Sequence, residues 1–495
     1  MAKNDFNSDH LETLDRDLGR LGTLETATAY VARPMVGPAL SLIFILATGI
    51  IAALFFDASS NGMIVIVAAI FGAYMALNIG ANDVANNMGP AVGANALTMA
   101  GAIAIAAIFE SAGALIAGGD VVSTIAKGII APSSMQSVDV FIWAMMAALL
   151  SAALWVNMAT WVGAPVSTTH SVVGGVMGAG IAAAGFGAVD WGTMSKIAAS
   201  WVISPLLGGV IAAAFLWFIK ANIIYRDDKI AAAKRWVPVL VGIMAGAFAS
   251  YLALKGLKKL IKIDLTTAVI IGLAVGVGFW IIMRPVIARQ SVGLENRNKS
   301  LKKLFNVPLI VSAALLSFAH GANDVANAVG PLAAIVQASN SGDYASAISI
   351  PLWVMVIGAA GISFGLFLFG PKLIRVVGNQ ITKLNPMRAY CVALSAAITV
   401  IVASWLGLPV SSTHIAVGAV FGVGFFREWD TARRMKQAKV VVEQTPVIAK
   451  EERSRRKLVR RSHFMSIIAA WVITVPAAAL ISAVIFSVIN WVTGS

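Results

Sequence analysis

Two polar motifs each occur twice in this chain, in the same order and inside otherwise apolar stretches. The first reads Gly-Ala-Asn-Asp-Val-Ala-Asn at residues 80–86 and again at 321–327. The second reads Pro-Val-Ser-Thr-Thr-His at 165–170 and, with one substitution, Pro-Val-Ser-Ser-Thr-His at 409–414. The copies are offset by 241 and 244 residues, so order and spacing are both duplicated. This duplication predicts two structural repeats that build one common site where they meet.

The repeats lie in a chain that is too apolar for a soluble protein. Of its 495 residues, 59% are hydrophobic and 12% are charged, with a mean hydropathy of +0.84. A soluble domain carries about 25% charged residues, and this length can hold roughly a dozen spans of about 20 residues. We therefore expect an all-α, multi-pass protein of the inner (plasma) membrane. It should have about 12 transmembrane helices in two inverted repeats, with re-entrant helical hairpins at the polar motifs.

The positive charge of the chain supports this topology. The formal net charge is +14, but the basic residues lie between the apolar runs, which indicates membrane orientation and not a nucleic-acid partner. Basic loops at 220–235, 284–303 and 427–462 should face the cytoplasm, and the two repeats are then inverted. A short basic stretch at 255–259 falls on the outer side in this count. The polar N-terminal residues show no cleavable signal peptide.

Duplicated and interrupted apolar segments are typical of secondary transporters, so we name the segments accordingly. We expect a cytoplasmic N-terminal segment (1–34), an extra N-terminal helix (35–62), transport repeat 1 (63–220), connecting helices with basic loops (221–304) and transport repeat 2 (305–495). Repeat 2 carries a basic cytoplasmic insertion at 427–462, expected to be a solvated loop, with regulation or lipid-headgroup binding as the alternative. The short runs at 164–185 and 409–426 should be half-helices or hairpin arms.

The first motif places Asp83 and Asp324 inside apolar segments, where a carboxylate faces the protein interior or a water-filled cavity. One such residue could be a structural carboxylate satisfied by helix ends or amides. Two at matched positions, each preceded by an asparagine, indicate function. The glycines before each motif and the Gly-Pro pair after it should break the helix. Freed carbonyls, together with Asn82, Asp83, Asn323 and Asp324, would then suit a hard cation.

The second motif has the chemistry of an anion site. Proline fits the first turn of a helix and serine or threonine caps it, so free N–H groups and the positive end of the helix dipole face outward. Hydroxyl groups add donors without adding charge, and they come from Ser167, Thr168, Thr169, Ser411, Ser412 and Thr413. A single copy would be read as ordinary capping, whereas two inverted copies could hold a tetrahedral oxyanion from both sides.

An anion beside two aspartates is repelled unless a cation or proton intervenes, which is the physical basis of symport. His170 and His414 recur at matched positions and could carry protons or be hydrogen-bonded structural groups. His320 stands where the first repeat has Ile79, which breaks the symmetry. Glu110 is either part of a cation site or satisfied by a neighbouring serine.

Through its doubled Gly-Ala-Asn-Asp-Val-Ala-Asn motif the chain resembles the inorganic phosphate transporter (Pit) family of low-affinity phosphate symporters, over about residues 63–492. The resemblance implies inverted repeats, a transport part with helical hairpins and a scaffold part that supports a homodimer. It implies coupling to sodium or protons and, in bacterial members, transport of a neutral metal–phosphate complex. Matched by motif, the phosphate ligands would be Asp83, Thr168, Thr169, Ser411, Ser412 and Thr413, and the cation site Asn82, Asp83, Asn323 and Asp324.

Alternative functions stay open at this point. A symporter for another oxyanion such as sulfate is the nearest, and an anion channel, a membrane enzyme and a scaffold belong to other classes. We expect no enzymatic activity and no cofactor, since no set of nucleophile, base and oxyanion donors is evident. Cys391, the single cysteine, excludes an intramolecular disulfide and a cysteine-based metal site. As coupling ion we expect protons rather than sodium, because three of the five histidines lie on or beside the motifs.

Overall fold

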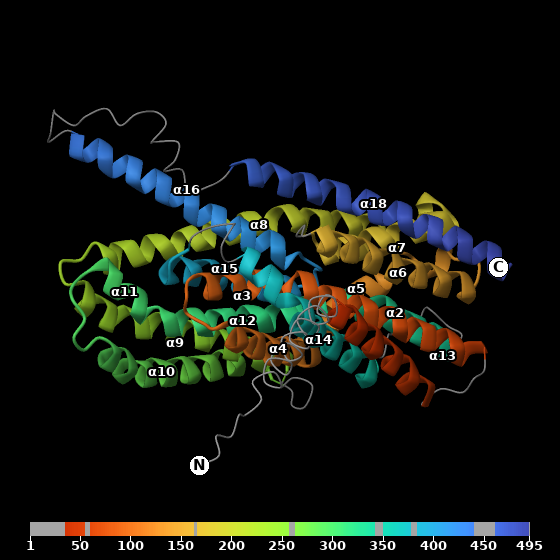
Figure 1. Cartoon of the computed structure of the whole chain (residues 1–495), viewed down its shortest axis with the longest axis horizontal. Coiled ribbons are helices and arrows are strands. Elements are labelled where there is room, and N and C mark those ends of the chain that lie inside the picture. The colour runs from red at the N-terminus through yellow and green to blue at the C-terminus, as the bar shows by residue number, and fades with distance from the viewer. Residues whose placement is uncertain are drawn as a thin grey trace, which may run out of the picture.

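The computed structural model describes residues 35–54, 60–162, 166–256, 263–341, 350–377, 384–439 and 461–494. They form an elongated bundle whose helices run mostly along its long axis (Figure 1). Within this described part there is no β-strand, and an isolated bridge joins Ile130 to Val189. Among the described residues, eleven segments are helical, long and apolar enough to cross a membrane. The prediction of an all-α membrane protein with about 12 spans is confirmed.

The first repeat contains seven α-helices. A helix at Met35–Leu54 precedes it. The repeat comprises α2 (Ser60–Asn82), α3 (Val84–Gly93), α4 (Met99–Ala117), α5 (Gly119–Lys127), α6 (Val138–Val162), α7 (Thr168–Ala184) and α8 (Trp191–Ile219), with 3-10 turns η1 (Pro132–Ser134) and η2 (Phe186–Ala188). Helix α7 has 17 residues, which is the short end of the roughly 17–25 residues that can cross a membrane, so the half-helix stays a prediction.

The second repeat follows a connecting pair of long helices. A π-helical turn η3 (Lys220–Ile224) leads into α9 (Lys229–Lys255), α10 (Leu265–Gln290) and the short α11 (Asn298–Leu304). The repeat comprises α12 (Asn306–Asp324), α13 (Ala326–Ser341), α14 (Leu352–Val376), α15 (Pro386–Trp405), α16 (Ser412–Lys439) and α18 (Arg461–Thr493). The expected loop at 427–462 is wrong in its first part, because residues 427–439 continue α16; residues 440–460 lie outside the described residues, as does the segment 1–34.

The two repeats are intertwined. Helix α2 packs on α14 of the other repeat, and its counterpart α12 packs on α4. In the same way α7 packs on α18, and α16 packs on α8. Each repeat therefore completes the packing of the other, and neither has a full core alone.

The two repeats also run in opposite directions. In Figure 1, α2 and α13 lie toward one end of the molecule, while α3 and α12 lie toward the other. The segment α2–α3 is thus antiparallel to its counterpart α12–α13, as an inverted repeat requires.

Both long segments are interrupted inside the first motif. Asp83 separates α2 from α3, and Val325 separates α12 from α13. At each break a backbone N–H bonds to a carbonyl only three residues back, from Asn86 to Asp83 (3.0 Å) and from Ala328 to Val325 (3.1 Å). The expected breaks at the glycines before the motif and at the Gly-Pro pairs after it are wrong, because Gly80 and Gly321 lie inside α2 and α12 and the prolines lie inside α3 and α13. The tightened turns leave the aspartates at the interruption itself.

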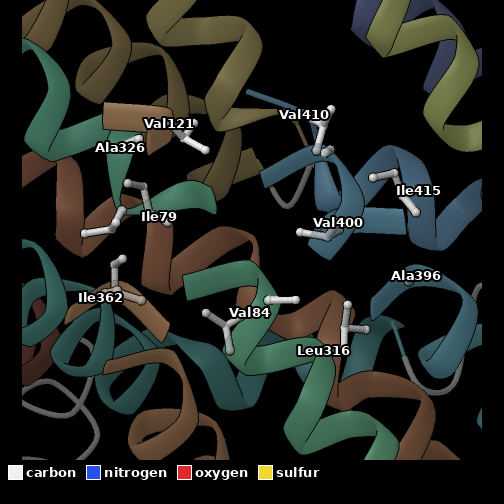
Figure 2. Close-up of a cluster of buried hydrophobic side chains, with 14 of the residues drawn as sticks. Ile79, Val84, Val121, Leu316, Ala326, Ile362, Ala396, Val400, Val410 and Ile415 are labelled. Carbon is white, nitrogen blue, oxygen red and sulfur yellow. The ribbon is translucent and has the colours of Figure 1, made fainter. Parts of the chain in front are cut away.

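Glycines let the crossing helices approach at equivalent places. A Cβ atom on Gly80 would collide with the carbonyl oxygen of Ile362, and one on Gly321 with that of Glu110. Helix backbones in membranes associate through such small residues. Buried aliphatic side chains, among them Ile79 and Val84, fill the space around these crossings (Figure 2).

Candidate functional site

The carboxylate of Asp83 lies buried at the first break, between hydroxyl groups from both repeats. Thr168 Oγ1, at the start of α7, donates a hydrogen bond to Asp83 Oδ2 at 2.6 Å. Thr413 Oγ1, at the start of α16, donates to Asp83 Oδ1 at 3.1 Å. The two copies of the second motif, 244 residues apart in sequence, therefore meet at one carboxylate of the first motif.

Asparagine amides link the repeats across this centre in a symmetric way. Asn86 Nδ2 donates to Thr413 Oγ1 at 2.8 Å. Its counterpart Asn327 donates to Thr169 Oγ1 and Thr168 Oγ1, both at 3.2 Å. Each amide comes from one repeat and each hydroxyl from the other, so these bonds hold the two hydroxyl motifs in register.

The N-termini of α7 and α16 face each other, as the sequence predicts. Ser167 caps α7 by accepting a hydrogen bond from the His170 N–H at 3.1 Å, and Ser411 accepts one from the His414 N–H at 3.4 Å. The His170 and His414 rings lie 4.5 Å apart between centroids. Two positive ends of helix dipoles thus converge, which is a favourable environment for an anion. Pro165 lies outside the described residues.

Several buried polar atoms at this centre have no hydrogen-bond partner among the described residues. They are Ser412 Oγ, Asn327 Oδ1 and Asp324 Oδ1. Buried polar atoms in proteins are nearly always paired, because an unpaired one costs about 1–3 kcal/mol. These three atoms are therefore available to a ligand that enters the centre.

Asp324 has different neighbours from Asp83. His320, one turn earlier in α12, places Nε2 3.0 Å from Asp324 Oδ2, close enough for an ion pair although the angle is not that of a hydrogen bond. The other ring nitrogen, Nδ1, lies 2.5 Å from Glu110 Oε2 in α4. The second Glu110 oxygen accepts a hydrogen bond from Asn87 Nδ2 at 2.8 Å. The buried chain therefore runs Asn87–Glu110–His320–Asp324.

Asp83, His320 and Asp324 lie together and could hold a cation, since ligand atoms from all three lie within 4.8 Å of one another. All three are buried, at 2% exposure or less. Two carboxylates this close in a dry interior repel each other strongly unless positive charge lies between them. The arrangement therefore calls for a bound cation, a proton, or both.

The other two predicted cation ligands have positioning contacts. Asn82 Nδ2 donates to Thr160 Oγ1 at 2.9 Å. Its counterpart Asn323 donates to Ser404 Oγ at 3.0 Å, and its side-chain oxygen accepts the Val410 N–H at 3.2 Å. These bonds tie the breaks to α6, α15 and the second motif.

The sequence alone leaves the roles of Glu110 and His320 open, and it predicts no role for Asn86 and Asn327. The asparagines carried a usable signal, since they recur at the 241-residue offset. The Glu110–His320 pair has no such signal, because it exists once. His170 hydrogen-bonds Ser167 through Nδ1 at 2.6 Å and lies on Trp201, with ring centroids 3.7 Å apart.

Comparisons with known proteins agree with this geometry. A model of the phosphate transporter family matches residues 79–482. A relative from Helicobacter pylori (strain J99) named "Putative phosphate permease" is 46% identical, over 96% of this chain and 99% of its own. A similarly named relative from Pyrococcus abyssi is 36% identical, over 86% of this chain and 97% of its own. A solved structure titled "The sodium-dependent phosphate transporter" aligns with a TM-score of 0.78 and 34% identity, covering 86% of this chain and 99% of that one.

Proposed function

This chain belongs to the phosphate transporter family, and from that premise we propose that it is a symporter that moves inorganic phosphate across the plasma membrane together with a cation. The observation that carries the proposal is the meeting of two capped helix N-termini and their hydroxyls at one buried point. Ser167, Thr168, Thr169, Ser411, Ser412 and Thr413 supply donors without charge. A tetrahedral oxyanion accepts hydrogen bonds in several directions, which matches donors that arrive from both repeats.

In the proposed cycle phosphate takes over the hydroxyl donors that now point at Asp83. Thr168 and Thr413 each receive a hydrogen bond from an asparagine, so their own protons are free to turn from the carboxylate to a ligand. Ser412, without a partner among the described residues, is already available. Asp83 can meet a protonated phosphate oxygen by accepting its hydrogen bond.

We propose the proton as the coupling ion and place it in the chain Glu110–His320–Asp324. A histidine whose two nitrogens both lie beside carboxylates suits the imidazolium form, because its positive charge then offsets both negative charges. Its positive charge would offset the repulsion between phosphate and the two aspartates. Phosphate and proton would then each favour the binding of the other, which is what symport requires.

Sodium is the second candidate, and a specific observation favours it. The structurally similar transporter is titled sodium-dependent, and Asp83 and Asp324 offer the oxygen ligands that such a cation prefers. Asn82 and Asn323 use their amide nitrogens for the bonds to Thr160 and Ser404, and the Asn323 oxygen also accepts the Val410 N–H.

The deciding experiment is uptake of radiolabelled phosphate into proteoliposomes under imposed gradients. We expect accumulation above equilibrium with an inward proton gradient in sodium-free buffer. Accumulation only with a sodium gradient would assign sodium. Downhill flux that never accumulates would assign an anion channel, and equal competition by sulfate would assign a general oxyanion carrier. A strict need for Mg²⁺ or another divalent ion would assign the metal–phosphate complex as the transported species.

Assembly as a homodimer belongs to the same proposal. The mass of the purified protein in detergent, after correction for bound detergent, tests it directly, and a monomeric mass would contradict it.

A further inference from the structure

A polar pocket away from the central site lies between α3, α11 and α15. It has a volume of about 410 Å³ and is lined by the residues that end α3, by Lys302 of α11 and by the first turn of α15 with Arg388. In Figure 1 these three helices lie toward the same end of the molecule, where α9 and α10 meet the basic segments. By the distribution of positive charge this end is cytoplasmic.

The charges around this pocket are positive and lack acidic partners. No carboxylate lines it. Within the described part of the chain the guanidinium of Arg388 has no salt bridge, and its charged neighbours include Arg427 and Lys220. Asp430, which lies beside Lys220, already accepts hydrogen bonds from Lys220 (2.6 Å) and Tyr225 (2.5 Å). The half-buried Arg388 is thus surrounded by like charge.

Two helix ends face the pocket, the C-terminus of α3 and the N-terminus of α15. The last carbonyls of α3 accept hydrogen bonds from the N–H groups of residues 94–96, where Asn95 takes the left-handed conformation (φ 58°). On the opposite wall α15 begins with its positive dipole end, capped by Asn385. The two charged side chains that line the pocket, Lys302 and Arg388, are both positive, and the N-terminus of α15 adds to them.

Both walls lead back to the central site. Helix α3 starts directly after Asp83, so the pocket lies roughly 15 Å from that carboxylate at 1.5 Å per residue. The far end of α15 carries Ser404, which bonds Asn323. Two continuous helices therefore join the pocket to the central site.

We propose that this pocket is a second binding site for a phosphate-type oxyanion, held by Arg388 and Lys302 at the cytoplasmic mouth. Arginine and lysine are the usual donors to phosphate, and arginine can bind two of its oxygens at once. The site goes beyond the proposed function and takes from it only the identity of the anion. A free phosphate ion and a lipid phosphate headgroup share this chemistry.

The test is equilibrium binding of ³²P-labelled inorganic phosphate to the purified full chain in nanodiscs of neutral phosphatidylcholine. We expect two phosphates per chain in the unchanged protein and one in Arg388→Gln. Lys302→Gln should weaken the second site about tenfold, because it removes one charged donor. Arg388→Lys should keep the second site at reduced affinity. Arg289→Gln, which removes an exposed charge from α10 without touching the pocket, is the matched control and should bind two.

One phosphate per chain in the unchanged protein, or equal weakening by Arg388→Gln and Arg289→Gln, would overturn the proposal. In nanodiscs that contain phosphatidic acid, a fall to one phosphate that depends on Arg388 would support the site and assign the occupant as a lipid headgroup. Uptake measured on the same preparations separates the two proposals. Arg388-dependent binding without transport would contradict only the proposed transport function. Transport without Arg388-dependent binding would contradict only the proposed second site.

Discussion

Ile79 in the first repeat and His320 in the second occupy corresponding positions, one turn before each motif aspartate. Ile79 packs beside Ile362 in the aliphatic cluster of Figure 2, and His320 contacts Glu110. We call Ile79–Ile362–Asp83 the first half-site and His320–Glu110–Asp324 the second. All these side chains are buried, at 2% exposure or less. Each pair takes one residue from each repeat, and equivalent locations thus hold an apolar pair beside Asp83 and an ionisable pair beside Asp324.

The backbone frame of the two half-sites is shared. Gly80 crosses α14 at Ile362, and Gly321 crosses α4 at Glu110, so Ile362 and Glu110 are structural counterparts. One residue on, Ser111 and Ser363 hydrogen-bond each other at 2.8 Å, as expected for equivalent residues beside a pseudo-twofold axis. The repeats therefore keep their crossings and amide links, and they differ in the side chains that carry charge. We infer that phosphate binding uses both half-sites and cation binding mainly the second.

The largest expected effect comes from removing either aspartate charge. Asp83→Asn and Asp324→Asn should each reduce phosphate uptake to background while the protein still inserts, because the coupling cation then loses a carboxylate in a dry site. Proteoliposome uptake, with detergent-extracted yield as the folding control, measures this. Near-normal uptake by both variants would show that the carboxylates are not needed for transport. Loss of uptake in only one variant would show that only the aspartate of that half-site is needed.

The second prediction converts one half-site into the other. Glu110→Ile or His320→Ile alone should cost about 3–5 kcal/mol of stability, since each leaves a buried charge without its partner. The double variant rebuilds the apolar pair of the first half-site and should be more stable than His320→Ile alone, because it also removes the unpaired Glu110, although Asp324 still lacks its His320 partner. Uptake should be lost in all three variants.

Thermal unfolding in detergent measures these differences, and Ile362→Val, expected to cost about 0.5–1.5 kcal/mol, is the control for a plain loss of packing. A double variant less stable than either single one would show that the backbone around the second half-site does not accept the apolar pair of the first. Retained proton-driven uptake in the double variant would show that the coupling proton does not bind at the second half-site.

The third prediction compares equivalent hydroxyls. Thr168→Ala and Ser412→Ala should each weaken phosphate binding by about 1.5–3 kcal/mol, because each removes a donor to a charged group. Only Thr168→Ala should also destabilise the ligand-free protein, since Thr168 bonds Asp83 whereas Ser412 Oγ has no partner among the described residues. Ser171→Ala, one turn further along α7, is the control. Unchanged phosphate affinity in both variants would exclude the hydroxyl motifs from the site.

The sequence predicted the parts of the site that are duplicated. Two copies of a motif at one offset identify Asp83, Asp324 and the hydroxyl rows, because chance does not repeat them in order. The Glu110–His320 contact joins residues 210 apart and exists once, so no repeat reveals it. The expected break at the Gly-Pro pairs failed for a different reason. A proline removes one backbone hydrogen bond, which a packed membrane helix tolerates, so propensity alone misplaced the break by several residues.

The smallest expected effect concerns a difference that lies far from the half-sites. Helix α16 extends well beyond its counterpart α7, and Asp430 ties this extension to Lys220 and Tyr225. Burial favours the neutral acid, but the hydrogen bonds from Lys220 and Tyr225 prevail and hold the pKa of Asp430 below its usual range. A lowered pKa means that this anchor is present above the unfolded value of about 3.9 and is lost only as the pH falls through the still lower folded value.

The anchor should therefore be constant between pH 5 and 8, and any pH dependence of uptake in that window must arise at the half-sites. We expect Asp430→Asn to leave the shape of the pH profile unchanged. Deletion of residues 441–458 should keep uptake within about twofold of the unchanged protein, since these residues carry none of the duplicated motifs and changes outside a functional site usually have small effects. Uptake measured at several pH values with both variants checks this. A displaced profile in Asp430→Asn, or loss of uptake in a correctly inserted deletion, would place the α16 extension inside the transport cycle, and the two repeats would then differ in a second, functional respect.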